Sequence, residues 1–113
     1  MTDGPSNMLH IDTDVRSDGV VVAVAGEIDL ATADDMVSQV AGHLAGSPAT
    51  LTIDFAGVRF CDSAGINALV RLRGLCVEAG WQFRVVNPQG QVRRVLVDLT
   101  GLGELLNIQD GTS

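Results

Sequence analysis

Ser63 is the residue whose type and neighbours most clearly suggest chemistry, and it lies in the segment VRFCDSAG, residues 58–65. A hydrolase nucleophile on a sharp strand-to-helix turn needs the pattern Gly-x-Ser-x-Gly, but Cys61 replaces the first glycine here. His10 and His43 stand in no recognisable triad motif. We therefore expect no catalytic residue in this chain. From its position before a predicted helix, the Ser63 hydroxyl is expected to cap the first helical turn.

The two cysteines, Cys61 and Cys76, are too few for a structural zinc site, and the two histidines are distant in sequence. No metal site and no cofactor are expected. Cys76 is expected to be a small apolar residue on a helix. Because the adjacent Asp62 disfavours a thiolate, Cys61 is also expected to be buried as a small hydrophobe. The alternative is a redox role, in which oxidation of Cys61 alters partner binding.

The composition excludes several classes of protein. The chain has 113 residues, 46% of them hydrophobic, a net charge of −7, and seven cations that are all arginines. Nucleic-acid binding needs clustered cations, and Schiff-base or P-loop chemistry needs lysine. No apolar run approaches the roughly 20 residues of a membrane span, and residues 1–7 lack the apolar region of a signal peptide. We expect a cytoplasmic protein without direct membrane contact.

The charge is placed unevenly along the chain. Residues 1–58 carry nine acids and one arginine, a net charge of −8, whereas residues 59–113 carry five acids and six arginines, a net charge of +1. A dipolar surface of this kind favours oriented docking on a protein partner. The alternative is that the charge serves solubility alone.

Hydrophobic periodicity predicts the strands that must position Ser63. Alternation of apolar and polar residues predicts half-buried strands, and an unbroken run rich in β-branched residues predicts a strand covered on both faces. Residues 57–62 are expected to form a loop or a strand end. The alternating strands are predicted at residues 9–15 and 51–55, the covered strand at 20–25, a further strand at 83–86, and a short strand or helix at 105–108.

Three helices are expected between these strands. Thr32 is predicted to cap the first helix with its hydroxyl, and Asp35 completes a pattern similar to a capping box. The second helix is predicted over residues 63–79, and the third begins with Asn87 as its cap and Pro88 in the first helical position. The resulting order, β-β-α-β-α-β-α, predicts a single α/β domain. Its small mixed sheet should carry helices mainly on one face.

Two segments at this separation resemble a known family. The first is GEIDLATA, residues 26–33, and the second is VRFCDSAG, residues 58–65. Together with the element order they resemble the STAS domain and, more narrowly, the bacterial anti-sigma factor antagonists, or anti-anti-sigma factors. The resemblance implies a STAS-type domain over residues 8–109. The ends, residues 1–7 and 110–113, are expected to be flexible, as chain termini commonly are.

The resemblance implies partner switching in the control of transcription, as in bacterial stress responses. The chain would bind an anti-sigma factor with a GHKL-type serine kinase fold and so release a sigma factor. That kinase would phosphorylate the serine after the motif aspartate, here Ser63, and break the complex. A PP2C-type phosphatase would restore it. The partner-binding surface implied by the resemblance consists of Asp29, Asp62, Ser63, Ala64, Gly65 and Ile66.

The sequence departs from the family pattern at two points. The second serine of the Asp-Ser-Ser-Gly motif is Ala64, and the usual Gly-Leu-Gly becomes Gly65-Ile66-Asn67. The first change removes an alternative phosphate acceptor and leaves Ser63 alone in the motif. A second interpretation keeps the same surface without phosphorylation: a constitutive STAS interaction subunit of a transporter ATPase complex. In both interpretations the chain is not an enzyme.

Overall fold

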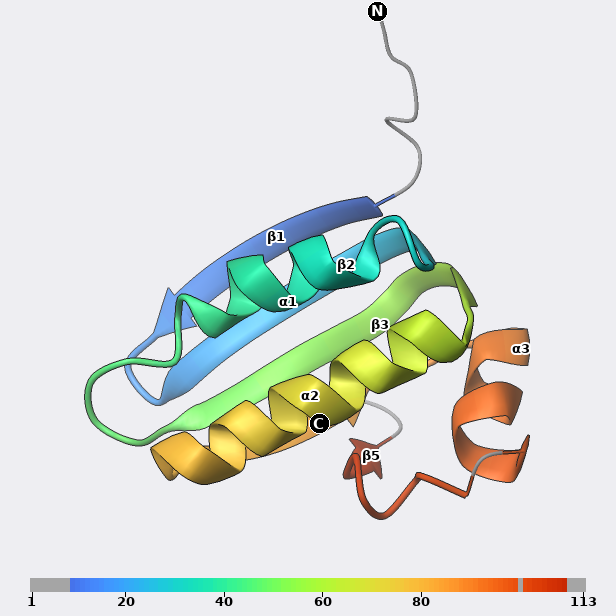
Figure 1. The fold of residues 1–113 in the computed structure, drawn as a ribbon. Helices are drawn as coiled ribbons and strands as arrows, with labels where there is room; N and C mark the ends of the chain where they lie inside the picture. The colour runs from blue at the N-terminus through green and yellow to red at the C-terminus, as the bar shows by residue number, and fades with distance from the viewer. Residues whose placement is uncertain (1–8, 100, 110–113) are drawn as a thin grey trace, which may run out of the picture.

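Two helices cover one face of a five-stranded sheet (Figure 1). The computed structural model describes residues 9–99 and 101–109, so the ends predicted to be flexible, residues 1–7 and 110–113, lie outside the described residues. In chain order, the elements are β1 (Leu9–Arg16), β2 (Gly19–Ile28), α1 (Ala33–Ala41), β3 (Thr50–Cys61), α2 (Ser63–Ala79), β4 (Gln82–Val86), α3 (Gly90–Arg93), the π-helix η2 (Arg94–Leu99) and β5 (Ile108–Gln109).

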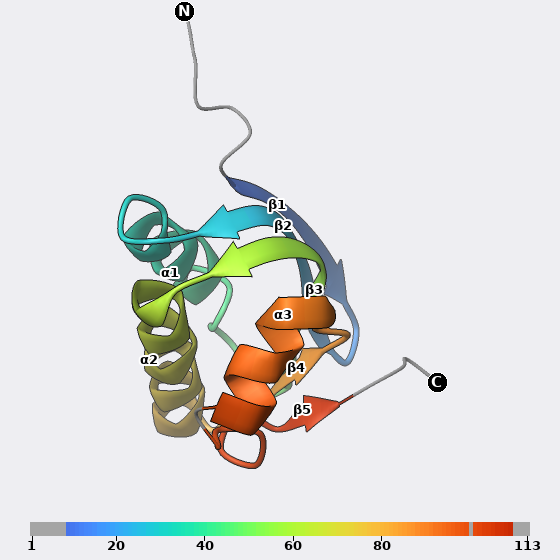
Figure 2. The same cartoon turned by 90° about the vertical axis from the view of Figure 1, so that its right-hand side faces the viewer.

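The strands lie in the sheet in the order in which they occur along the chain. β1 pairs antiparallel with β2, and each later pair of neighbours is parallel. Right-handed crossovers between successive parallel strands place the connecting helices on the same face. Figure 2 shows α1 and α2 together on one side of the sheet, with β5 at its edge. The prediction of a small mixed sheet with helices mainly on one face is confirmed.

β2 is covered on one face only. Val20, Val22 and Val24 are buried and belong to the main core, whereas Ala23 on the opposite face is exposed. The prediction that this strand is covered on both faces is therefore wrong. An unbroken apolar run fits a doubly covered strand, but the second face of β2 carries Val21, Ala23 and Ala25, and in Figure 2 no helix covers that face.

β3 is longer than the alternating pattern predicted, because it runs through residues 57–61 to Cys61. Two register shifts against β2 explain why its periodicity is lost in the sequence. The second shift lies between the pairs Gly26–Val58 and Glu27–Phe60, so Arg59 is an extra residue on β3. Such a bulge bends the strand and redirects its side chains, and here both Arg59 and Phe60 are exposed.

The third helix does not begin at Asn87 and Pro88 as predicted. Asn87 has a φ of 60°, in the left-handed region, which an asparagine tolerates but which a helix cap does not use. The helix starts at Gly90 after Gln89 and continues as the π-helix η2. Figures 1 and 2 show this segment toward the carboxyl ends of the strands, apart from the α1–α2 pair.

Candidate functional site

The carboxyl ends of β2 and β3 lie side by side and bring the two sequence motifs together. Ile28 pairs with Cys61 in the parallel register, and the Asp62 backbone N–H donates to the Ile28 carbonyl at 3.2 Å. The turn that begins at Asp29 and the helix that begins at Ser63 therefore leave the same edge of the sheet. Parallel neighbours always place their carboxyl ends together, so the sequence motifs meet because β2 and β3 are adjacent.

Asp62 caps α2. Its backbone is extended, with φ −97° and ψ −168°, and its carboxylate accepts the N–H groups of Ala64 at 2.9 Å and Gly65 at 3.2 Å. Ser63 is the first helical residue, and its side chain is exposed. The expectation that Ser63 itself is the cap is wrong, because the aspartate before it satisfies the free amides of the first turn. Within the described part of the chain, no hydrogen bond engages the Ser63 hydroxyl.

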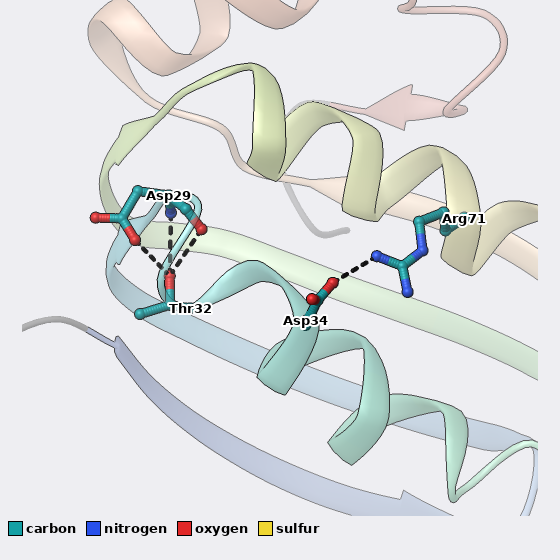
Figure 3. Close-up of polar contacts among 4 residues, drawn as sticks. All are labelled: Asp29, Thr32, Asp34 and Arg71. Atoms are coloured by element: carbon teal, nitrogen blue, oxygen red, sulfur yellow. Dashed lines mark hydrogen bonds and ion pairs between the residues drawn. The ribbon is translucent and has the colours of Figure 1, made fainter.

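The turn between β2 and α1 is closed by side-chain hydrogen bonds (Figure 3). The Asp29 carboxylate accepts the Ala31 N–H at 2.9 Å. The Thr32 hydroxyl accepts the Asp29 N–H at 3.0 Å and donates to the Glu27 carbonyl at 3.1 Å. Asp29 is half-buried, and Thr32 is only 8% exposed. Hydrogen bonds among its own residues therefore hold this turn in its conformation.

The predicted capping box of α1 is therefore wrong. Thr32 occupies the cap position, but its backbone is helical rather than extended and its side chain makes no bond to the first turn. The hydroxyl donates to the Glu27 carbonyl at the end of β2 instead. Asp35, the other member of the predicted box, is exposed.

Cys61 and Gly65 pack against each other in the interior at the start of α2. Both are buried, and a Cβ atom on Gly65 would lie 2.6 Å from the Cys61 Sγ and 2.8 Å from the Ile28 Cγ2. Burial, with a smaller contribution from the Asp62 carboxylate, raises the pKa of the Cys61 thiol to about 12. A thiol in this state holds little thiolate, so packing is its evident role. Gly65, predicted as a partner contact, lies in the interior and lets α2 approach the sheet.

Ser63 stands at the rim of an open groove of about 570 Å³. Ala64 and Ile66, two of the predicted partner-binding residues, line this groove and are half-buried. Sequence reasoning missed the other lining residues, Asn67, Val70 and Leu102. Asn67 and Val70 follow one and two helical turns after Ser63, a spacing that could have identified them. Nothing in the sequence places Leu102 there, since it comes from the segment after η2.

Two exposed apolar side chains flank the same edge and were also missed. Leu30, in the turn after β2, is 84% exposed, and Phe60, at the end of β3, is 48% exposed. The guanidinium of Arg59, next to Phe60, lies 4.0 Å from the Glu27 carboxylate; the Arg59 side chain is exposed and the Glu27 side chain is partly buried. The edge therefore offers acidic, apolar and basic groups together, a mixture suited to binding a protein.

The described residues contain no group of three or more His, Cys, Asp or Glu side chains that could hold a metal ion. No helix in residues 9–99 and 101–109 is both long enough and apolar enough to cross a membrane. The arrangement at the edge consists of a free hydroxyl, two carboxylates already used in turns, and exposed apolar surface. It can accept a modification and contact a partner.

Comparison with known proteins shows which family and which solved structures this chain resembles. The sequence matches the model of the STAS domain over residues 10–112. A search of the curated protein sequences gave no match. An anti-sigma factor antagonist from Mycobacterium paratuberculosis is 29% identical, with a TM-score of 0.76 and coverage of 96% of this chain and 90% of that one. The anti-sigma factor antagonist SpoIIAA in its unphosphorylated form is 25% identical, with a TM-score of 0.72 and coverage of 92% and 90%. The phosphorylated form of the Bacillus cell fate determinant SpoIIAA shares the fold at 21% identity, with a TM-score of 0.70 and coverage of 92% and 93%.

Proposed function

The chain belongs to the STAS domain family, and on that premise we propose that it is an anti-sigma factor antagonist switched off by phosphorylation of Ser63. The similar solved structures include anti-sigma factor antagonists that cover nine-tenths or more of this chain. In this role the chain binds an anti-sigma factor with a GHKL-type serine kinase fold in the bacterial cytoplasm. The sigma factor is thereby released, and transcription follows.

One observation supports Ser63 as the phosphate acceptor: its hydroxyl is exposed on the first residue of α2 because Asp62 performs the capping. A hydroxyl in a fixed, exposed position is accessible to a kinase. A phosphate at the start of a helix is also compatible with the helix dipole, so the fold should survive the modification. The chain acts here as the substrate of an enzyme.

The geometry of the cap favours a phosphate that points outward. The amides of Ala64 and Gly65 are already taken by the Asp62 carboxylate. A phosphate on Ser63 would meet that carboxylate if it turned back toward these amides. It therefore projects toward solvent, or toward a bound partner.

Charge explains how one phosphate breaks the complex. It adds about −1.5 to −2 charges beside Asp62, on the edge that also carries Asp29, and takes the chain from −7 to about −9. A partner docked over Ser63 would bury this charge and face its repulsion. A loss of a few kcal/mol, or roughly two decades in affinity, is the expected result. No change of fold is needed, and a PP2C-type phosphatase restores the binding form.

A pull-down followed by phosphorylation tests this function. Tagged wild-type chain is used to capture partners, which are identified by mass spectrometry, and the captured anti-sigma factor is then expressed and purified. With ATP it should phosphorylate wild type and not Ser63→Ala. Ser63→Asp should bind it more weakly than Ser63→Ala, although aspartate carries less charge than phosphate. Capture of a transporter ATPase without any sigma regulator would instead favour a constitutive subunit that is not phosphorylated.

A further inference from the structure

Leu30 is the most exposed large apolar side chain among the described residues, at 84%. It lies in the turn between β2 and α1, between Asp29 and Ala31. A leucine in this position gains nothing from the core of its own molecule. Its burial in a complex would remove most of its apolar surface from water, which is the main source of affinity at protein interfaces.

Hydrogen bonds on both sides of Leu30 hold the turn in one conformation. The Asp29 carboxylate accepts the N–H of Ala31, and the Asp29 carbonyl accepts the N–H of Thr32 at 3.1 Å. The buried Thr32 hydroxyl ties the turn to the Glu27 carbonyl at the end of β2. The leucine therefore lies on a backbone that is already ordered, so little conformational entropy of this turn would be lost on binding.

The position of this turn beside Ser63 indicates which partner Leu30 would contact. The Asp62 N–H bonds the carbonyl of Ile28, which directly precedes Asp29, so Leu30 and Ser63 project from neighbouring strand ends. We propose that Leu30 is an apolar anchor which enters a pocket of the anti-sigma factor docked over Ser63, and that Thr32 is the positioning residue that holds it in place. This inference rests on the proposed function. Because Asp29 precedes Leu30 and Asp62 lies at the neighbouring strand end, the pocket of the anti-sigma factor is expected to be apolar with a basic rim.

Two exposed valines serve as matched controls because they lie away from these strand ends. Val77, 59% exposed, is in the last turn of α2, and Val15, 67% exposed, pairs with Val20 at the start of β2. Neither side chain lies beside Ser63. Truncation of either one removes exposed apolar surface of a comparable kind without touching the proposed interface.

The anchor is tested by titrating the purified anti-sigma factor captured by the wild-type chain. Leu30→Ala should weaken its binding by about tenfold to a hundredfold, whereas Val77→Ala and Val15→Ala should bind like wild type. Because Leu30 does not touch the reacting hydroxyl, Leu30→Ala should raise the KM for phosphorylation of Ser63 and leave kcat unchanged. Equal binding by Leu30→Ala and Val77→Ala would overturn the inference.

Thr32 is tested by one substitution that removes its hydroxyl and one that keeps it. Thr32→Val removes the hydroxyl that accepts the Asp29 N–H, so it should speed hydrogen exchange at the Asp29 amide and weaken binding by roughly tenfold. Thr32→Ser keeps a hydroxyl and should leave both properties close to those of the wild type. Wild-type binding by Thr32→Val would overturn the positioning role. If the wild-type chain binds no anti-sigma factor, the proposed function fails and this inference fails with it. If wild type binds and Leu30→Ala binds equally well, the inference alone fails.

Discussion

The starts of α1 and α2 are alike in sequence, but the hydroxyl is buried at the start of α1 and exposed at the start of α2. Each helix follows a strand end, and each has an aspartate and a hydroxyl residue nearby. In α1 the Thr32 hydroxyl is buried and tied to the strand end, whereas in α2 the Asp62 carboxylate caps and leaves the Ser63 hydroxyl exposed. A hydroxyl at a helix start is therefore available for modification only when another side chain satisfies the first turn.

The two starts also differ in how they rest on the sheet. The third residue after the cap is Asp35 in α1, which is exposed, and Gly65 in α2, which is buried against Cys61 and Ile28. The start of α1 is stabilised by its own turn, and the start of α2 by close packing on the strand ends. Each of the following changes alters one side of this comparison.

Gly65→Ala should cause the largest loss of stability. The added Cβ would lie 2.6 Å from the Cys61 Sγ, and overpacking of this kind costs about 1–3 kcal/mol, more than the fraction of a kcal/mol that alanine gains in a first helical turn. Urea unfolding should show a lower free energy of unfolding for Gly65→Ala, partly recovered in a Cys61→Ala background. Asp35→Ala, at the equivalent place in α1, should be close to neutral. Equal effects at the two positions would contradict the difference in packing.

Asp62→Ala should have the next largest effect, because it removes the acceptor of two amides in α2. Loss of an N-cap costs about 1 kcal/mol, and thermal unfolding should show it. Asp62→Asn keeps an acceptor in place and should retain most of the stability. It also removes the charge, so comparing its partner binding with wild type separates capping from electrostatics. If Asp62→Ala is as stable as wild type, Asp62 is not the cap that frees Ser63.

The pH dependence of stability should show a smaller effect, confined to alkaline solution. The Cys61 pKa is raised to about 12 in the folded chain from an ordinary value of 9.0. Between these values the unfolded chain loses the thiol proton and the folded chain keeps it. The free energy of unfolding should therefore be unaffected below pH 9 and should fall as the pH rises toward 12.

The composition makes this measurement unusually clean. The chain has no tyrosine and no lysine, so the cysteines dominate titration in that window. Burial also raises the Cys76 pKa, to about 11. Cys61→Ala should flatten the alkaline slope in part, and a slope unchanged by this substitution would show that Cys61 is not buried as described.

Arg71→Ala should have the smallest effect. The Arg71 guanidinium lies 2.8 Å from the Asp34 carboxylate and links α2 to the first turn of α1, but both groups are largely in solvent (Figure 3). Exposed pairs of this kind contribute about 0–1 kcal/mol and weaken with added salt. Chemical unfolding at low and high salt should show a small difference at low salt only. A loss as large as that of Gly65→Ala would mean that the α1–α2 contact depends on this pair.

Much of the fold follows from local patterns in the sequence. Alternation located β1, and the apolar spacing and the glycine after Ala79 located α2 with the observed bounds. The failures required tertiary information. Nothing in the run at 20–25 reveals that only one face of β2 is covered. The left-handed Asn87 defeated a cap prediction that was otherwise well founded on the following Pro88.

The site was predictable where it depends on strand order. Asp29 and Asp62 come together because β2 and β3 are parallel neighbours, and the resemblance to the family had implied that they share one surface. The choice of cap was not predictable, since both Thr32 and Ser63 are favoured cap residues and only the backbone geometry decides. The exposure of Leu30 and the arrival of Leu102 at the groove depend on turns and on the segment after η2, which carry no periodic signal.

The most direct measurement is phosphosite mapping of the chain after incubation with ATP and the captured anti-sigma factor. The mechanism predicts one phosphate, on Ser63, with none on Thr32 and none on the Ser63→Ala variant, and it predicts that the phosphorylated chain no longer binds the anti-sigma factor. Phosphate incorporated into Ser63→Ala at the wild-type level, or a phosphorylated chain that still binds, would contradict it.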